Sequence, residues 1–434
     1  MAVGEAAVLG ALLRQLDDSQ WMRAAEIETL QRQQLALLLG HCARYSPYVA
    51  RALKRAELKP SQFAKPGMLR RLPILSRRQL QDSKDVFCSM APNAHMPVVE
   101  SGTTGSTGTP VNVLRTAING MTQCAFIMRG YEWHGRSYGD RYCSLRVGHA
   151  KIEQTDSWGP PASKLFPTGP ALNIPLATDL DTQIDLIAEF KPRVLSISPT
   201  NLRALARRCA ERAVAIPSLE LYFTIAEPVG EELREEVEGL LGGRIVDTYS
   251  SQELGCIAIQ CPDSGLYHVM AEGMIVEVVD EKGGPCAEGQ AGRLVITDLL
   301  NFATPLIRYA IGDWAEHGPA CPCGRGLPTL RRIMGRERNM VTLPNGKRFW
   351  PRLGNAHYRQ IAPITQLQII QETLARFELR LVVGRNLTPS EEAQLREHLQ
   401  TCLEWPVDVH ISYYDDEIPA GPGGKHEDFI SLAA

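Results

Sequence analysis

The sequence predicts an α/β protein with a large N-terminal domain and a small, mobile α+β C-terminal domain. Three observations carry this prediction. Between residues 116 and 249, amphipathic helical segments alternate with short apolar segments at the spacing of βαβ units, which indicates mixed, largely parallel sheets. Between residues 273 and 297, short strands separated by glycine turns indicate a small antiparallel β unit. Beyond residue 335, alternating strands surround one helical segment at residues 390–405, which indicates a separate module.

We therefore assign residues 1–335 to the N-terminal domain and residues 336–434 to the C-terminal domain. Residues 1–90 form a helical lead-in, because leucines recur at helical spacing at positions 9, 12, 13 and 16 and again between residues 30 and 39. We assign no chemistry to this lead-in.

The composition excludes several classes of protein. A chain of 434 residues, 44% hydrophobic and 22% charged, is typical of a soluble globular protein with a full core. The net charge of −3 gives no basic surface for nucleic acid, and no apolar run is long enough to span a bilayer. The N-terminus lacks the features of a signal peptide, and eleven cysteines are too few for a disulfide scaffold of this size. We expect a cytoplasmic monomer or homodimer with reduced thiols.

The segment Ser101–Pro110, with the sequence SGTTGSTGTP, combines three glycines with six hydroxyl side chains. Such a loop lets backbone N–H groups and hydroxyls converge on an anion, so a phosphate loop between two strands is one interpretation. A flexible Gly/Ser/Thr loop is the other. The segment is not a Walker A loop, because no lysine follows its glycines.

Four further motifs follow in order. They are Tyr249–Gly255, Asn301–Asp313, Gly335-Arg336 and Gly423–Lys425. Together with the loop, this order resembles the adenylate-forming superfamily of acyl-CoA synthetases, peptide-synthetase adenylation domains and luciferases. The Cys-Pro-Cys-Gly-Arg segment at residues 321–325 makes the chain most similar to the phenylacetate-CoA ligase branch and its capsule-biosynthesis-like relatives. The resemblance extends from about residue 90 to the end of the chain.

This resemblance implies an ATP site. The residues that it assigns to nucleotide binding are Ser101, Thr103, Thr104, Gly105, Thr107, Ala226, Glu227, Pro228, Tyr249, Ser250, Asp313 and Arg336. The threonines would donate to the β- and γ-phosphates, and Tyr249 would flank the adenine. Asp313 would hold both ribose hydroxyls, since a carboxylate only accepts hydrogen bonds. Arg336 would meet the ribose or phosphate side of the nucleotide.

Two residues are implied to be catalytic. Glu253 would bind Mg²⁺ between the phosphates, although Gln252 stands where the family usually has threonine. Its alternative role is that of an acidic residue at the start of a following helix. Lys425, on a glycine-rich segment, would stabilise the charge that develops between carboxylate and α-phosphate. Its alternative role is that of a solvated lysine.

The implied reaction is ATP-dependent activation of a carboxylic acid, plausibly aromatic, to an acyl-adenylate, followed by acyl transfer. The residues assigned to the acid pocket are Phe126, Tyr131, His149 and Phe223. CoA is the first choice of acceptor. An amine or a hydroxyl is the alternative, because Arg338 and Asn339 replace the family's usual hinge aspartate pair and residues 342–351 depart from its pantetheine segment. A non-catalytic nucleotide-binding or scaffold protein is a third hypothesis, which the presence of Glu253 and Lys425 disfavours.

Cysteine and histidine residues also predict a metal site. Cys261, His268, Cys321 and Cys323 supply the ligands of a closed tetrahedral Zn²⁺ site, and phenylacetate-CoA ligase relatives often carry one. Buried free thiols are the alternative. Cys256 and Cys286 are the nearest substitutes for one of these ligands.

Overall fold

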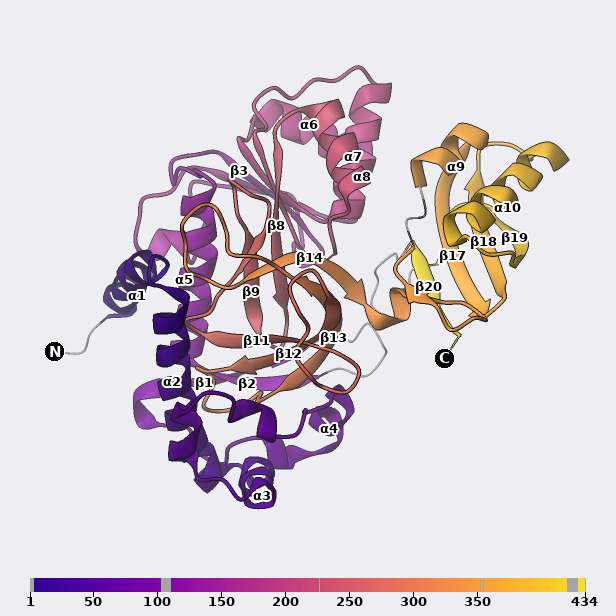
Figure 1. Ribbon diagram of the computed structural model, residues 1–434. Coiled ribbons are helices and arrows are strands. Elements are labelled where there is room, and N and C mark those ends of the chain that lie inside the picture. Colours follow the sequence, from indigo (N-terminus) through magenta and orange to yellow (C-terminus); the bar gives the residue numbers. More distant parts are fainter. Residues whose placement is uncertain are drawn as a thin grey trace. The chain divides into compact units, whose positions relative to one another are not determined.

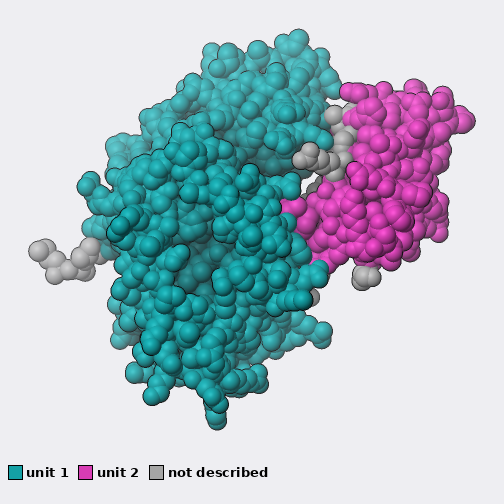
Figure 2. Space-filling view, in the orientation of Figure 1, with its two compact units in different colours: residues 1–103, 111–333 teal, residues 104–110, 334–434 magenta. Residues whose placement is uncertain are grey.

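The computed structural model describes residues 4–102, 111–225, 227–351, 353, 355–419 and 428–433 (Figure 1). The chain divides into two compact units, of which the first holds residues 1–103 and 111–333 and the second holds residues 104–110 and 334–434 (Figure 2). The functional division into domains at residues 335 and 336 stays a prediction.

The secondary-structure elements follow the predicted alternation closely. The α-helices are α1 (Glu5–Ser19), α2 (Ala24–Tyr45), α3 (Pro47–Ala56), α4 (Arg77–Asp82), α5 (Ala117–Trp133), α6 (Leu180–Phe190), α7 (Pro199–Glu211), α8 (Glu231–Leu241), α9 (Asn355–Ile361) and α10 (Pro389–Leu403). The strands are β1 (Val98–Gly102), β2 (Asn112–Thr116), β3 (Tyr142–Arg146), β4 (Glu153–Thr155), β5 (Ala171–Pro175), β6 (Val194–Ile197), β7 (Leu221–Thr224), β8 (Arg244–Ser251), β9 (Gly255–Gln260), β10 (Tyr267–Val269), β11 (Met274–Val279), β12 (Ala291–Asp298), β13 (Tyr309–His317), β14 (Thr329–Arg336), β15 (Val341–Thr342), β16 (Arg348–Phe349), β17 (Ile364–Thr373), β18 (Arg376–Val383), β19 (Asp408–Tyr414) and β20 (Phe429–Ser431). None of the helices in the described part of the chain has the length and apolar character needed to cross a membrane.

One large sheet organises the first unit. Its strand order is β11-β12-β13-β14-β10-β9-β8-β7-β6-β3-β5-β4. The strands β5, β3, β6, β7 and β8 pair in parallel, as the βαβ spacing predicted. The predicted antiparallel unit is present, and it continues the same sheet, because β8 pairs in parallel with β7 and antiparallel with β9. Strands β1 and β2 form a separate antiparallel pair around the segment 103–110.

Helices α6, α7 and α8 cover one face of the parallel strands (Figure 1). Each presents apolar side chains one turn apart, such as Ile184 and Ile187 on α6, and these pack against Leu195 and Ile197 of β6. All four side chains are fully buried. Burying one such side chain stabilises a fold by about 1.5–3 kcal/mol, so the amphipathic pattern alone explains this layer.

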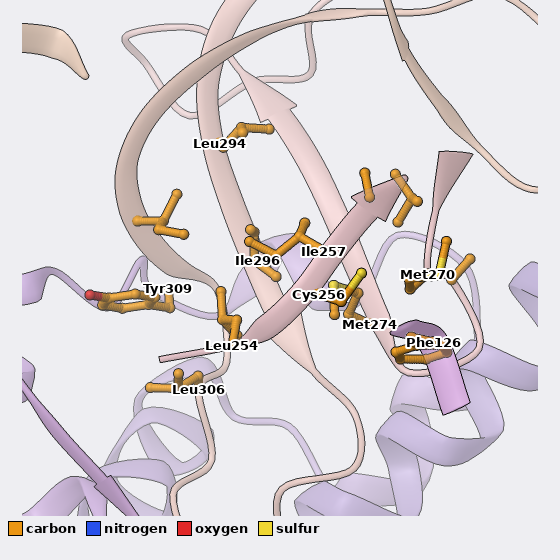
Figure 3. Close-up of a cluster of buried hydrophobic side chains, with 14 of the residues drawn as sticks. Phe126, Leu254, Cys256, Ile257, Met270, Met274, Leu294, Ile296, Leu306 and Tyr309 are labelled. Atoms are coloured by element: carbon orange, nitrogen blue, oxygen red, sulfur yellow. The ribbon is translucent and has the colours of Figure 1, made fainter. Parts of the chain in front are cut away.

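Helix α5 packs on the other side, within the largest buried cluster (Figure 3). Phe126 lies near Met270 and Met274 in this cluster, and Gly273 makes room for its ring. The same helix anchors the N-terminal helix α1 through Arg129, which also forms a buried ion pair with Glu272. Arg129 contacts the Glu272 carboxylate at 2.6 and 3.1 Å and also donates to the Leu16 carbonyl oxygen at 2.6 Å.

The second unit is the predicted α+β module. Its sheet has the order β19-β18-β17-β20, and α10 packs on it through Leu395, Leu399 and Leu403. A capping box between Thr388 and Glu391 starts α10, which explains why the helix begins there. The predicted fold class is therefore confirmed in both units.

A loop between β13 and β14 joins the lead-in to the main sheet. The backbone N–H of Gly326 donates to the carbonyl oxygen of Gln20 at 2.9 Å. A Cβ atom at position 326 would overlap the carbonyl oxygen of Met22. The approach of the two backbones therefore requires glycine here.

We expect Gly326→Ala to lower the free energy of unfolding by about 1–3 kcal/mol, because the lead-in must move away from the loop. Gly239→Ala is the matched control, since residue 239 lies on the exposed side of α8 and an added Cβ there meets nothing within 4 Å. Alanine at 239 should stabilise slightly. Denaturant unfolding of both variants measures the difference, and equal midpoints would contradict the assigned contact.

Candidate active site and cysteine–histidine cluster

Two residues from distant motifs, carried by two strands of the large sheet, meet through their side chains. The hydroxyl of Tyr249, on β8, donates to Oδ2 of Asp313, on β13, at 2.6 Å. Asp313 is only 8% exposed, and Tyr249 is half-buried beside it. The structure thus brings together the residues to which the sequence assigned the adenine and the ribose.

A β-bulge sets the position of Asp313. Ala310 pairs with Val295 and Trp314 pairs with Arg293, so three residues of β13 oppose a single residue of β12. Gly312, inside the bulge, has a φ of +89°, which favours glycine. A bulge re-aims the side chains beside it, which explains why Asp313 follows a glycine in this motif.

Glu253 lies in the turn that connects β8 and β9. No helix follows it, because residues 252–254 form a turn that leads directly into β9, and the alternative role as a helix-start acid is therefore wrong. Its side chain is 3% exposed and pairs with Nη1 of Arg77 at 2.5 Å. Arg77 comes from α4, in the lead-in to which the sequence assigned no chemistry. Nη2 of Arg115, on β2, donates to the carbonyl oxygen of Gln252 at 2.5 Å.

The Asn301–Asp313 motif also holds β2, the strand that follows residues 103–110. Thr304 accepts a hydrogen bond from the backbone N–H of Leu114 at 2.8 Å, and Asn301 donates to the Leu114 carbonyl at 2.9 Å. Asp298 organises this turn by accepting from the N–H groups of Leu300 and Asn301. Burial raises the pKa of Asp298 to about 6. The sequence offered no sign of this buried acid.

The other residues assigned to the nucleotide have varied surroundings. Ser101 is half-buried on β1, and Ser250 and Pro228 are exposed. Glu227 accepts from the N–H and the hydroxyl of Thr200 at 3.0 and 2.6 Å, so it caps the start of α7 in this structure. Arg336 ends β14 in the second unit. The remaining calls lie outside the described residues: Thr103, Thr104, Gly105, Thr107, Ala226 and Lys425.

The four residues assigned to the acid pocket do not form one group. The Tyr131 and Phe223 rings meet edge to face, with centroids 5.6 Å apart. Phe126 lies in the core cluster instead, and Nε2 of His149 contacts the hydroxyl of Ser144 at 3.0 Å. Arg136, which the sequence did not single out, is 5% exposed.

Aromatic rings surround Arg136. Its guanidinium carbon lies 4.0 Å from the Tyr131 ring centroid, 4.3 Å from that of Tyr142 and 3.9 Å from that of Trp158. Cation–π contacts of this kind stabilise a guanidinium that burial removes from water. They also fix the orientation of the Tyr131 ring.

The predicted metal ligands converge. The ligand atoms of Cys261, His268, Cys321 and Cys323 all lie within 4.8 Å of one another. Sγ of Cys261 and Sγ of Cys321 are 3.7 Å apart, and Nε2 of His268 is 3.3 Å from Sγ of Cys323. Tetrahedral Zn²⁺ with Zn–S bonds of about 2.3 Å places its ligand atoms roughly 3.5–3.8 Å apart. The four residues therefore fit the ion, whereas Cys256 and Cys286 lie outside this group in the described structure.

The chain is similar to several known proteins. A phenylacetate-coenzyme A ligase of Thermus thermophilus is 26% identical over 83% of this chain and 82% of the relative. Protein CapK of Staphylococcus aureus is 20% identical over 91% of this chain and 87% of the relative. A crystal structure of 2-hydroxyisobutyryl-CoA ligase in the postadenylation state has the same fold, with a TM-score of 0.77 at 20% identity, over 95% of this chain and 91% of that one.

The matching family model and the curated relatives identify the chain as an ATP-dependent, AMP-forming ligase. The family model described as AMP-binding enzyme matches residues 51–302, and the chain belongs to this family. The predicted resemblance to adenylate-forming enzymes, and to their phenylacetate-CoA ligase-like branch, is confirmed.

The buried carboxyl group of Asp298 generates a pH-dependent prediction. A folded-state pKa of about 6 exceeds the unfolded value of about 3.9, so the native state binds the proton more tightly. This contribution to stability is present below about pH 4 and is lost as the pH rises to 6, by about 3 kcal/mol. Asp298→Asn should remove this loss of stability with rising pH. The asparagine amide keeps an oxygen that accepts from the turn, and it offers an N–H group to the buried Oδ1 of Asn119.

Denaturant unfolding of the wild type and Asp298→Asn at several pH values between 4 and 7 measures this effect. The difference in unfolding free energy should shift in favour of the variant by about 3 kcal/mol over this range. Parallel pH profiles for the two proteins would show that Asp298 titrates alike in the folded and unfolded chains.

Proposed function

We propose that this chain joins a carboxylic acid to CoA through an acyl-adenylate, with release of pyrophosphate and then AMP. The observation that carries the proposal is the hydrogen bond between Tyr249 and Asp313, next to the turn that holds Glu253. Three groups therefore lie near the end of β8. They are the aromatic ring of Tyr249, the carboxylate of Asp313, which can accept two hydroxyls, and the buried acid Glu253. Open α/β sheets bind their ligands at such strand ends.

Each residue has a distinct task in this proposal. Asp313 accepts the two ribose hydroxyls, and Tyr249 flanks the adenine while its hydroxyl fixes the carboxylate. Glu253 would hold Mg²⁺, which neutralises the charge on the phosphates when it is bound. The hydroxyls of residues 101–107 would donate to the β- and γ-phosphates, and Ser250, Glu227 and Pro228 border the nucleotide.

Lys425 is the proposed catalytic cation, and Arg336 the second cation that meets the nucleotide. An ammonium between the attacking carboxylate and the α-phosphate stabilises the charge that both share during adenylation. The sequence around residue 422 is rich in glycine, which permits many backbone conformations, and this supports the proposed role of Lys425.

The acid is proposed to be aromatic, and the acceptor to be CoA. The Tyr131 and Phe223 rings, in edge-to-face contact, offer the ring surface that such an acid packs on. Relatives named phenylacetate-coenzyme A ligases support the same substrate class and the same acceptor.

We also propose that Cys261, His268, Cys321 and Cys323 bind a structural Zn²⁺. Their ligand atoms all lie within 4.8 Å of one another, and the sulfur atoms of Cys261 and Cys321 have the separation expected around the ion. The ligands come from the end of β9, from β10 and from the loop before β14, so the ion would tie these segments together. Arg325 in the same loop stacks on Trp133, with its guanidinium carbon 4.6 Å from the ring centroid.

The reaction is tested by pyrophosphate release with a library of carboxylic acids, followed by AMP release with CoA or amines. We expect release with aromatic acids and CoA-dependent turnover. Asp313→Ala should raise the KM for ATP about tenfold, because Asp313 grips the ribose in ground and transition states alike. Glu253→Gln should instead lower kcat about a hundred-fold.

Glu232→Gln, on the exposed start of α8, is the control for these variants and should behave as the wild type. Turnover with amines but not with CoA would show that the acceptor is an amine and not CoA. No acid-dependent pyrophosphate release from any acid would refute the proposed function.

The zinc site is tested by metal analysis of protein purified without chelator. We expect about one Zn²⁺ per chain, and Cys321→Ser should lose the ion and melt several degrees earlier, since metal binding is coupled to folding. Cys286→Ser, outside the cluster, should keep its zinc. Wild-type protein without zinc, or equal zinc in both variants, would exclude this ligand set.

A further inference from the structure

The ion pair between Arg77 and Glu253 joins the lead-in to the proposed nucleotide site. Arg77 opens α4, which a capping box between Ser76 and Gln79 fixes in place. Two residues earlier, Leu75 bonds to the chain at the start of β13: its N–H donates to the Arg308 carbonyl and its carbonyl accepts from Ala310, both at 2.9 Å. Arg77 is therefore held by the strand that also carries Asp313.

A second guanidinium lies on the other side of the turn. Arg115 donates to the Gln252 carbonyl, and its charge interacts with those of Glu253 and Asp298. The Nε atoms of Arg77 and Arg115 are buried and have no hydrogen-bond partner among the described residues. Two guanidinium groups, each with an N–H group that has no partner among the described residues, thus flank the Glu253 carboxylate.

The side chains of Arg77 and Glu253 differ in exposure to solvent, and this difference matters for ligand binding. The Glu253 side chain is 3% exposed, whereas the Arg77 side chain is 20% exposed. A ligand can therefore reach part of the Arg77 side chain, whereas the Glu253 side chain is almost fully covered. Arginine matches the geometry of phosphate oxygens and binds them more strongly than neutral donors do.

We propose that Arg77 is a phosphate-binding residue of this site, which Glu253 holds in position for the β- and γ-phosphates of ATP and for the leaving pyrophosphate. The inference rests on the proposed function of the Tyr249–Glu253 segment. Gln252 stands where the family has a threonine hydroxyl, and Arg77 supplies a charged donor at the same turn. The guanidinium shares its N–H groups between the carboxylate and the phosphates, since it has five of them.

The test compares equilibrium binding of ATP and AMP to Arg77→Met by calorimetry, with and without Mg²⁺. We expect the dissociation constant for ATP to rise about ten- to hundred-fold in both conditions. The dissociation constant for AMP, which lacks the two outer phosphates, should change by less than about twofold. Arg78→Met is the matched control, because Arg78 follows on the same helix and pairs only with exposed Asp82. It should bind both nucleotides as the wild type does.

Two outcomes would overturn the inference. An equal loss of affinity for ATP and AMP would mean that Arg77 only shapes the fold of the site. A loss of ATP affinity confined to samples with Mg²⁺ would mean that Arg77 acts only through Glu253. Arg77→Lys keeps the charge and guards against misfolding, and it should show an intermediate loss for ATP alone. If no acid supports pyrophosphate release but Arg77→Met still loses ATP selectively, the proposed function fails and the phosphate contact stands.

Discussion

The double pairing of β8 is the constraint on which the candidate site depends. This strand pairs in parallel with β7 and antiparallel with β9, so it joins the βαβ half of the sheet to the antiparallel half. The tight turn after β8 is possible only because the next strand runs antiparallel, and that turn carries Glu253. Tyr249, two residues before the strand ends, then faces Asp313 from the antiparallel half. The two halves of the sheet therefore each contribute a residue to one site.

The lead-in is part of the same construction. Arg308 adopts a φ of +50°, which is unusual for a residue other than glycine, and its buried guanidinium donates to the carbonyl oxygens of Arg70 and Leu72. Glu277 balances its charge at 3.0 Å. The side chain of Gln31 on α2 donates to the carbonyl oxygens of Ala271 and Met274, both at 2.9 Å. These bonds hold the N-terminal helices against the strands that carry the site, and they explain how Arg77 can reach Glu253.

Sequence patterns predicted what depends on local periodicity or on residue type. Amphipathic spacing predicted the helices α6–α8. Cysteine and histidine identities predicted the four residues whose ligand atoms lie together in the structure. The patterns failed where the partner is distant along the chain. Arg77 lies 176 residues before Glu253, and nothing in the Ser-Arg-Arg sequence distinguishes the buried arginine from its exposed neighbour Arg78. Only the packing of α4 decides which of them turns inward.

The same reasoning explains the assignment of Phe126 to the acid pocket. A helix buried on several sides shows no clear polar face, so sequence cannot tell which of its rings borders a ligand and which fills the core. Tyr131 and Phe126 are five positions apart on α5, or about 140° around the helix axis, and therefore point in different directions. The phenol of Tyr131 meets Phe223 and Arg136, whereas Phe126 fills the space that Gly273 leaves.

The two buried carboxylates of the site are stabilised by different means, and the difference suits their proposed tasks. Glu253 is paired with a full positive charge, which offsets part of the cost of removing a carboxylate from water. Asp313 receives a neutral hydrogen bond from Tyr249, and a carboxylate has room for further donors on its two oxygens. A ribose brings two neutral hydroxyls and needs such an acceptor, whereas a triphosphate brings negative charge and needs the cations that flank Glu253. The charge pattern therefore supports the proposed binding mode, in which the sugar lies toward β13 and the phosphates lie toward the arginines.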